Sequence, residues 1–181
     1  MEEKIVPIFD DLKFRLEGLL KEFERGHTGW MYGYRKSPIN GTLQFHNGVD
    51  IPNVKGHPIF CPMNGVVLKA WFDDVAPRGY GGGNSVILLH SSGPFVRTGY
   101  CHMERFGKDI AAGMKVIKGQ IVGYVDSTGA STGNHLHFVS RSLFGNSIQS
   151  IDPLKYLLES VGLPMISDHK VGEDMLCPKR R

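Results

Sequence analysis

The first 27 residues carry the pattern of an amphipathic helix. Apolar side chains recur at spacings of three and four between residues 9 and 23, and acidic and basic side chains fill the opposite face. The pattern predicts a helix from Phe9 to Arg25, with Gly26 as its C-cap. Because the polar face mixes acids and bases instead of being mainly basic, we expect this helix to pack on the rest of the chain or on a second copy, and not on a membrane surface.

From residue 28 the pattern changes to short runs rich in β-branched and aromatic residues. Clusters of glycine, proline, serine and asparagine separate these runs, which is typical of an antiparallel sheet. The 23 glycines also suit a turn-rich β protein better than a helical bundle. Strands are predicted over residues 65–72, 84–90, 96–102, 120–125 and 135–141. The predicted fold is therefore mainly β, a compact antiparallel sheet or sandwich with a short helix towards each end.

The second predicted helix begins at Asp152, with the aspartate as N-cap and Pro153 in the first helical position. Beyond it the chain becomes polar and irregular. We therefore divide the chain into an N-terminal amphipathic helix (1–27), one folded domain (28–160) and an irregular tail (161–181). A chain of this length suits a single hydrophobic core.

Charge and hydropathy exclude several classes of protein. The net charge is +3, and the basic residues are scattered apart from a short cluster at residues 179–181, so we expect no nucleic-acid partner. No segment approaches the ~20 consecutive apolar residues that a membrane span needs. The first 26 residues also lack the apolar core of a signal peptide.

The three cysteines form no C-x-x-C pair. Cys61 and Cys101 lie in apolar runs and are expected to be small buried side chains, whereas Cys177 is expected to be exposed in the tail. His102 directly follows Cys101, but adjacent residues of a strand point to opposite faces. A cysteine–histidine pair for nucleophilic catalysis is therefore not favoured at this position.

Two short motifs concentrate side chains that can bind a metal. The segment HNGVD (46–50) places a histidine and an aspartate four residues apart, and both can face one ion if the central residues form a turn, for which Gly48 permits a positive φ. His135 and His137 are two residues apart, so on a strand both imidazoles point to the same side. Taken alone, each motif is equally compatible with an ordinary turn or with half-exposed strand histidines.

Together the two motifs point to a catalytic metal site. Two imidazoles and one carboxylate are a recurrent ligand set for zinc, and they leave the fourth tetrahedral position to water. Such a site keeps a positive charge, which lowers the pKa of the bound water towards ~7. The predicted strand that ends at His102 can place a further imidazole opposite His135. If these two are not ligands, each could take the proton of the water or stabilise the oxyanion of a tetrahedral intermediate.

With these motifs in order, the chain resembles the lysostaphin-type (LytM-like) zinc endopeptidases, which cleave peptide bonds in bacterial peptidoglycan. The resemblance covers about residues 29–158. Its blocks are GYRKSPI (33–39), HNGVDI (46–51), GVV (65–67), GNSV (83–86), YCHM (100–103), GQIVG (119–123) and TGASTGNHLHF (128–138). Cys101 stands where Ala or Ser is usual and Asn134 where Pro is frequent, and neither difference removes a functional group.

The resemblance implies one zinc ion per chain, held by His46, Asp50 and His137, with His102 and His135 in catalysis. It also implies a compact antiparallel β domain whose groove crosses the metal site. The implied activity is hydrolysis of peptide bonds in peptidoglycan cross-links by a metal-activated water with histidine-assisted proton transfer. Family members that act only as activators typically lack some of these five residues, so we expect an active enzyme.

Several questions stay open at the level of sequence. The alternatives are a non-catalytic module that binds peptidoglycan or a partner on the same fold, a zinc peptidase that acts on proteins, and a phage lysis or virion-associated cell-wall hydrolase. The partner groups are expected to be stem peptides or cross-bridges at the cell wall, but the bond that is cut and the oligomeric state are not predicted. Three routes to the wall are open: export by a signal peptide that this sequence has lost, phage-encoded release, or docking of the N-terminal helix on a carrier.

Overall fold

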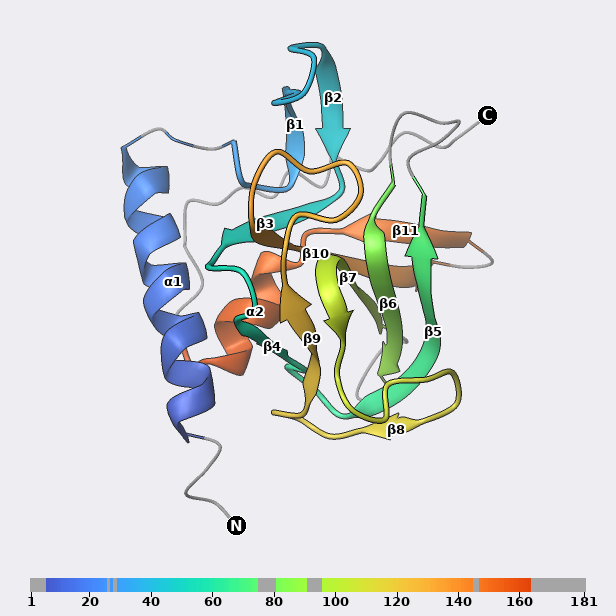
Figure 1. Cartoon of the computed structure of the whole chain (residues 1–181). Coiled ribbons are helices and arrows are strands. Elements are labelled where there is room, and N and C mark those ends of the chain that lie inside the picture. Colours follow the sequence, from blue (N-terminus) through green and yellow to red (C-terminus); the bar gives the residue numbers. More distant parts are fainter. Residues whose placement is uncertain are drawn as a thin grey trace.

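The computed structural model describes residues 6–25, 27, 29–74, 81–90, 96–144 and 147–163. This part of the chain is mainly β, as predicted, and every strand pair is antiparallel. The helices are α1 (Val6–Glu24) and α2 (Leu154–Ser160) (Figure 1). The strands are β1 (Gly33–Lys36), β2 (Leu43–His46), β3 (Gly48–Pro52), β4 (Pro58–Phe60), β5 (Gly65–Asp73), β6 (Gly83–His90), β7 (Val96–Phe106), β8 (Lys115–Val116), β9 (Ile121–Val125), β10 (His135–Phe144) and β11 (Ser147–Ile151).

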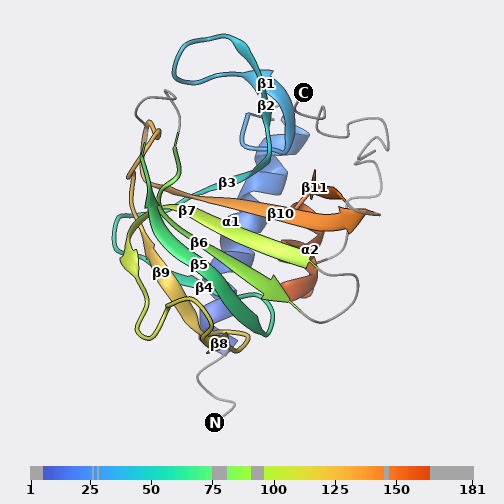
Figure 2. The same ribbon diagram turned by 90° about the vertical axis from the view of Figure 1, so that its right-hand side faces the viewer.

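A large sheet forms the body of the molecule, and β1 and β2 form a separate hairpin beside it. The large sheet has the order β11-β10-β7-β6-β5-β8, while β3 pairs with β10 and β9 pairs with both β4 and β7. Figure 2 shows β10, β7, β6 and β5 side by side, with α1 behind them. The five predicted strands are all present, and β7 and β10 run several residues beyond their predicted ends.

The hydrophobic core lies between one face of this sheet and the two helices. Tyr100 and Phe138 are almost fully buried and pack edge to face, with ring centroids 5.2 Å apart. Leu16 of α1 and Leu158 of α2 are fully buried in the same cluster. Burial of each such side chain contributes about 1.5–3 kcal/mol. Because strand residues alternate between faces, the other face of β10 and β7 is left to form a cleft.

Helix α1 packs on the domain, which was one of the two predicted positions. It begins at Val6, three residues before the predicted start, because Pro7 falls in the first turn, where its missing N–H has no helical partner to lose. Asp11 holds the helix to the loop after β3, since its Oδ2 contacts His57 Nε2 at 3.0 Å; the same oxygen pairs with Arg15 Nε, one turn along the helix, at 2.9 Å. The predicted C-cap, Gly26, lies outside the described residues.

Helix α2 differs from its prediction by one position. Pro153 is the N-cap and makes no side-chain cap bond, so Asp152 is not the N-cap that the sequence predicted. The Asp152 carboxylate still accepts the N–H of Leu154 at 2.8 Å, two residues further on, in the manner of an Asx turn. Most of the predicted tail, from residue 164 onward and including Cys177, lies outside the described residues. Neither helix of the described residues has the length and apolar character that crossing a bilayer requires.

Candidate metal centre

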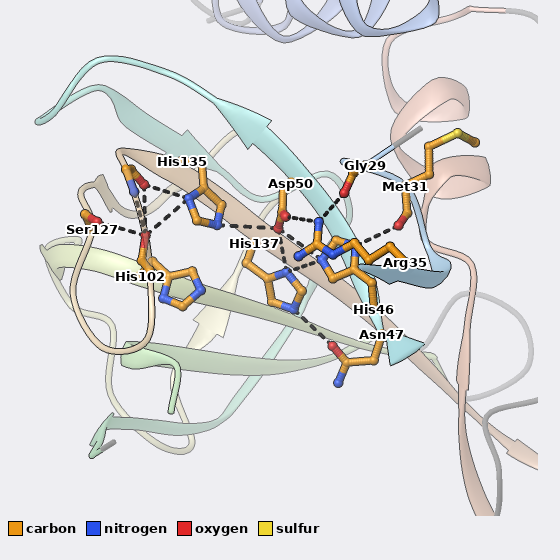
Figure 3. Close-up of polar contacts among 12 residues, drawn as sticks. Gly29, Met31, Arg35, His46, Asn47, Asp50, His102, Ser127, His135 and His137 are labelled. Atoms are coloured by element: carbon orange, nitrogen blue, oxygen red, sulfur yellow. Dashed lines mark hydrogen bonds and ion pairs between the residues drawn. The ribbon is translucent and has the colours of Figure 1, made fainter. Parts of the chain in front are cut away.

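His46, Asp50 and His137 converge at the junction of three strands. His46 ends β2, Asp50 lies in the middle of β3, and the β3–β10 register places His137 directly opposite Asp50. His46 Nε2 lies 3.1 Å from both Asp50 Oδ1 and His137 Nδ1, and His137 Nδ1 lies 2.8 Å from Asp50 Oδ1 (Figure 3). Three ligand atoms of one tetrahedral zinc ion lie about 3.3 Å apart, given metal–ligand distances of about 2.0–2.2 Å. The cluster therefore has the dimensions of a metal site.

The outer nitrogens of both histidines are committed to oxygen acceptors. His46 Nδ1 lies 2.6 Å from the carbonyl oxygen of Met31, which can only accept a hydrogen bond, so this nitrogen carries the proton. His137 Nε2 lies 3.1 Å from Asn47 Oδ1 and donates in the same way. Burial also lowers the pKa of His137, which favours its neutral form. The inner nitrogens, His46 Nε2 and His137 Nδ1, both lie against Asp50 Oδ1, an arrangement that a cation stabilises.

Asp50 is held in its ionised form from both sides. Burial alone would raise the pKa of its carboxyl, but contacts with His135, His137 and His46 outweigh that effect and lower the pKa. The second oxygen, Oδ2, forms an ion pair with Arg35 Nη1 at 2.8 Å, and Arg35 is also bonded to the carbonyl of Gly29. Arg35 thereby orients Asp50 so that Oδ1 remains available to an ion.

The structure corrects the predicted role of Gly48. Its φ is not among the positive values of the described glycines, and it opens strand β3 instead of a turn. A Cβ at this position would lie 2.5 Å from the carbonyl oxygen of Phe138 and 2.7 Å from His137 Cε1. Glycine is therefore required by the close approach of β10, which carries His137, and not by turn geometry.

Gly48→Ala is expected to lower the free energy of unfolding by about 1–3 kcal/mol, because the added methyl group overpacks a site bounded by backbone. Zinc affinity should fall with it, since β10 must move and take His137 along. Thermal unfolding and a zinc titration measure the two effects. Gly18→Ala is the matched control, because nothing lies within 4 Å of its added Cβ. Equal behaviour of the two variants would contradict the close-approach argument.

His102 and His135 face the same centre without completing the ligand cluster. Their Nδ1 atoms donate to carbonyl oxygens, His102 to Thr128 at 2.8 Å and His135 to Gly133 at 2.7 Å, which turns each Nε2 towards the centre. His135 Nε2 lies 3.4 Å from Asp50 Oδ1. The ring centroids of His102 and His135 lie 4.8 Å apart. Burial lowers the pKa of His102 to about 4, so its ring is neutral near pH 7 and can accept a proton.

The backbone at His102 overturns the predicted alternation with Cys101. His102 has φ +63°, in the left-handed region that residues other than glycine rarely adopt, and its N–H donates to the Gly82 carbonyl at 2.6 Å. Consequently Cys101 and His102 both line the cleft instead of facing opposite ways. Burial raises the pKa of the Cys101 thiol to about 11, so it stays protonated and is a poor nucleophile.

The cluster lies in a cleft of about 980 Å³. The β1–β2 hairpin contributes Arg35, Pro38 and Ile39 to its wall, the loop before β10 contributes residues 130–134, and the exposed face of the large sheet forms its floor. A volume of this order accommodates several residues of an extended peptide and is larger than a site for a lone ion requires.

Comparison with known proteins identifies the family. The model of the family described as "Peptidase family M23" matches residues 44–153, more than half of the chain. The chain belongs to peptidase family M23. The matched segment of this M23 chain contains all five histidine and aspartate residues of the centre, and it excludes α1 and the β1 strand that carries Arg35.

Relatives and solved structures agree with membership of family M23. The chain is 36% identical over 110 residues to the DD-carboxypeptidase/endopeptidase Mpg of Neisseria meningitidis serogroup B, covering 61% of this chain and 23% of Mpg. It is 34% identical over 128 residues to the glycyl-glycine endopeptidase ALE-1 of Staphylococcus capitis, covering 70% of this chain and 33% of ALE-1. The catalytic domain of lysostaphin from Staphylococcus simulans superposes with a TM-score of 0.58 at 35% identity, covering 71% of this chain and 90% of that domain. The chain thus spans a third or less of these curated relatives but matches nearly all of a catalytic domain.

Two positioning residues escaped the sequence analysis. Arg35 lies in a block that the resemblance quoted, but nothing local connects it to Asp50, fifteen residues away. Asn47 was considered only as a turn residue, although its side chain fixes the ring of His137, ninety residues away. A covariation signal between such distant positions is what could have identified them.

Proposed function

We propose that this chain is a zinc-dependent endopeptidase that hydrolyses peptide bonds in the cross-links of bacterial peptidoglycan. The observation that carries the proposal is the convergence of His46 Nε2, His137 Nδ1 and Asp50 Oδ1, with the outer ring nitrogens already bound to oxygen acceptors. Neutral imidazoles and a carboxylate suit zinc, which binds nitrogen and oxygen ligands in tetrahedral geometry. These three residues are the proposed ligands of one ion.

When bound, the ion supplies a Lewis acid that lowers the pKa of water and polarises a carbonyl group. The remaining chemistry belongs to His135 and His102. Each Nδ1 bonds to a backbone carbonyl, which turns Nε2 towards the centre. Burial keeps His102 neutral, whereas contact with Asp50 outweighs burial at His135 and raises the pKa of that ring. One imidazole can accept the proton of the attacking water, and the protonated ring can then donate to the departing amine. No covalent intermediate with the protein is required.

The substrate class is proposed from the relatives and from the cleft. Mpg is named for DD-carboxypeptidase and endopeptidase activity and ALE-1 for cleavage between glycines, so the family site accepts more than one kind of bond. An open cleft of about 980 Å³ suits an extended peptide segment. Stem peptides or cross-bridges are therefore the proposed partners, and the bacterial cell wall the proposed place of action.

The test combines metal content with hydrolysis. Purified protein is expected to contain about one zinc per chain by elemental analysis and to release cross-linked peptides from purified sacculi. A chelator should stop release, and added zinc should restore it. Unstructured casein serves as the control substrate, and its equal cleavage would show a general protein peptidase. Bound zinc without release from sacculi of several cross-link types would instead show a binding module.

A further inference from the structure

Two arginines face each other across neighbouring strands in the cleft. The β10–β7 register places Arg141 directly opposite Arg97, and both line the same cleft as the metal centre. Side chains in directly opposite positions have Cβ atoms about 4.5–5.5 Å apart, and like charges there are destabilising. Local energetics therefore disfavour this pair, and such violations concentrate at functional sites.

Among the described residues, neither arginine has a partner that would offset this repulsion. The other arginines of the described residues each form an ion pair with a carboxylate: Arg15, Arg25, Arg35 and Arg105. No ion pair or hydrogen bond joins Arg97 or Arg141 to another side chain within the same described residues. Asp73 also lines the cleft, but it lies towards the metal centre, where its carboxylate accepts the N–H of Gly82 at 2.9 Å.

The pair lies in line with the metal centre. His137, Val139 and Arg141 follow one another at intervals of two residues along β10, and all three line the cleft. Gly99 lies opposite Val139, where it leaves room for the valine side chain between the two sites. Four residues of strand separate His137 from Arg141, a distance of about 13 Å. An extended peptide covers that distance with about four residues.

We propose that Arg97 and Arg141 form a subsite that binds a free carboxylate of the peptide substrate, about four residues from the bond that is cut. The subsite rests on the proposed function for its substrate, since stem peptides carry such carboxylates. Two adjacent guanidinium groups can bind one carboxylate with several charge-assisted hydrogen bonds, which removes their mutual repulsion. Peptides whose carboxylates are amidated would lose this interaction.

Binding and cleavage are measured separately on the full chain. The probes are cross-linked muropeptides released from sacculi, either intact or with their free carboxylates chemically amidated. Binding to the zinc-loaded protein is followed by tryptophan fluorescence in a stopped-flow instrument before turnover, because Trp71 lines the same cleft. Cleavage is followed afterwards by chromatography. The variants are Arg97→Gln, Arg141→Gln and both together, with Lys155→Gln on α2 as a control for loss of one positive charge.

The unmodified protein is expected to bind intact muropeptides about tenfold to a hundredfold more tightly than amidated ones, the effect of losing charge-assisted hydrogen bonds. The double variant should bind both forms equally, at the level of the amidated probe, and Lys155→Gln should behave as the unmodified protein does. Thermal unfolding of the double variant should be unchanged or shifted upward, because a repulsive pair is removed.

Other outcomes overturn the subsite. Equal binding of both probes by the unmodified protein, discrimination that survives in the double variant, or an equal loss for both probes would each exclude a carboxylate site at these arginines. Cleavage of either probe decides the proposed peptidase function independently. If the protein discriminates between the two probes but cleaves neither, the subsite is supported and the protein is a binding module. If it cleaves them without discriminating between them, it is a peptidase that lacks the subsite.

Discussion

His137→Ala is expected to abolish zinc binding and peptidase activity together. The substitution removes Nδ1, which lies 2.8 Å from Asp50 Oδ1 and 3.1 Å from His46 Nε2, and leaves only two protein ligands. Catalytic zinc sites use three protein ligands, so zinc content should fall from about one ion per chain to near zero. Without the ion, the pKa of water stays near its bulk value and hydrolysis of sacculi should fall to the background rate.

Elemental analysis and release of peptides from sacculi measure the two effects of His137→Ala. His27→Ala is the matched control, because His27 is an exposed histidine that contacts Glu22 and is not among the residues that line the cleft. His46→Gln provides a second test at the opposite side of the cluster with a smaller change in volume. A folded His137→Ala variant that retains one zinc per chain would show that the ligand set is wrong.

His102→Ala is expected to lower kcat by about 10²- to 10⁴-fold while zinc content stays near one ion per chain. His102 lies beside the cluster, with its ring centroid 5.8 Å from that of His137, and is not among the three atoms that converge on a metal-sized point. Its free Nε2 can therefore act in proton transfer without contributing to metal affinity. KM should change much less than kcat, because the group acts on the reacting atoms.

The comparison with His135→Ala separates the role of His135 from that of His102. His135 Nε2 lies 3.4 Å from Asp50 Oδ1, in contact with a proposed ligand, so its loss is expected to slow hydrolysis and to reduce zinc affinity slightly. Zinc titrations and kinetics on the same preparations separate rate from metal content. If His102→Ala emptied the metal site, the division between ligands and proton carriers would be incorrect.

The general character of the fold could be predicted from local patterns. The apolar stripe of the first helix and the longer runs that follow it predicted α1 and five of the eleven strands of the described residues, because helix and strand periods fix which side chains share a face. Strands β1, β2, β3, β4, β8 and β11 were not predicted. Boundaries were less accurate. Asp152 was predicted as the N-cap of α2, but the cap lies one residue later, at Pro153, although the Asp152 carboxylate still accepts the N–H of Leu154.

The candidate metal residues were found because their spacing is informative by itself. His135 and His137 share a strand face whatever that strand pairs with, and a histidine and aspartate four residues apart reinforce the pattern. The reason offered for Gly48 was incorrect, since it tolerates the close approach of Phe138 and His137 and adopts no positive φ. Which segment approaches a glycine is a property of the packed chain.

By itself the sequence determined the fold class and, through the order of its motifs, the family, and it supplied the candidate ligands as a prediction. The tertiary structure alone decided that Asp50 lies opposite His137, that Arg35 holds the second oxygen of that carboxylate, and that Arg141 faces Arg97. Periodicity states which side of a strand a residue occupies, but it does not state which distant strand pairs with it or in what register. Those pairings follow from burial of the whole core, and they alone place these groups within reach of one another.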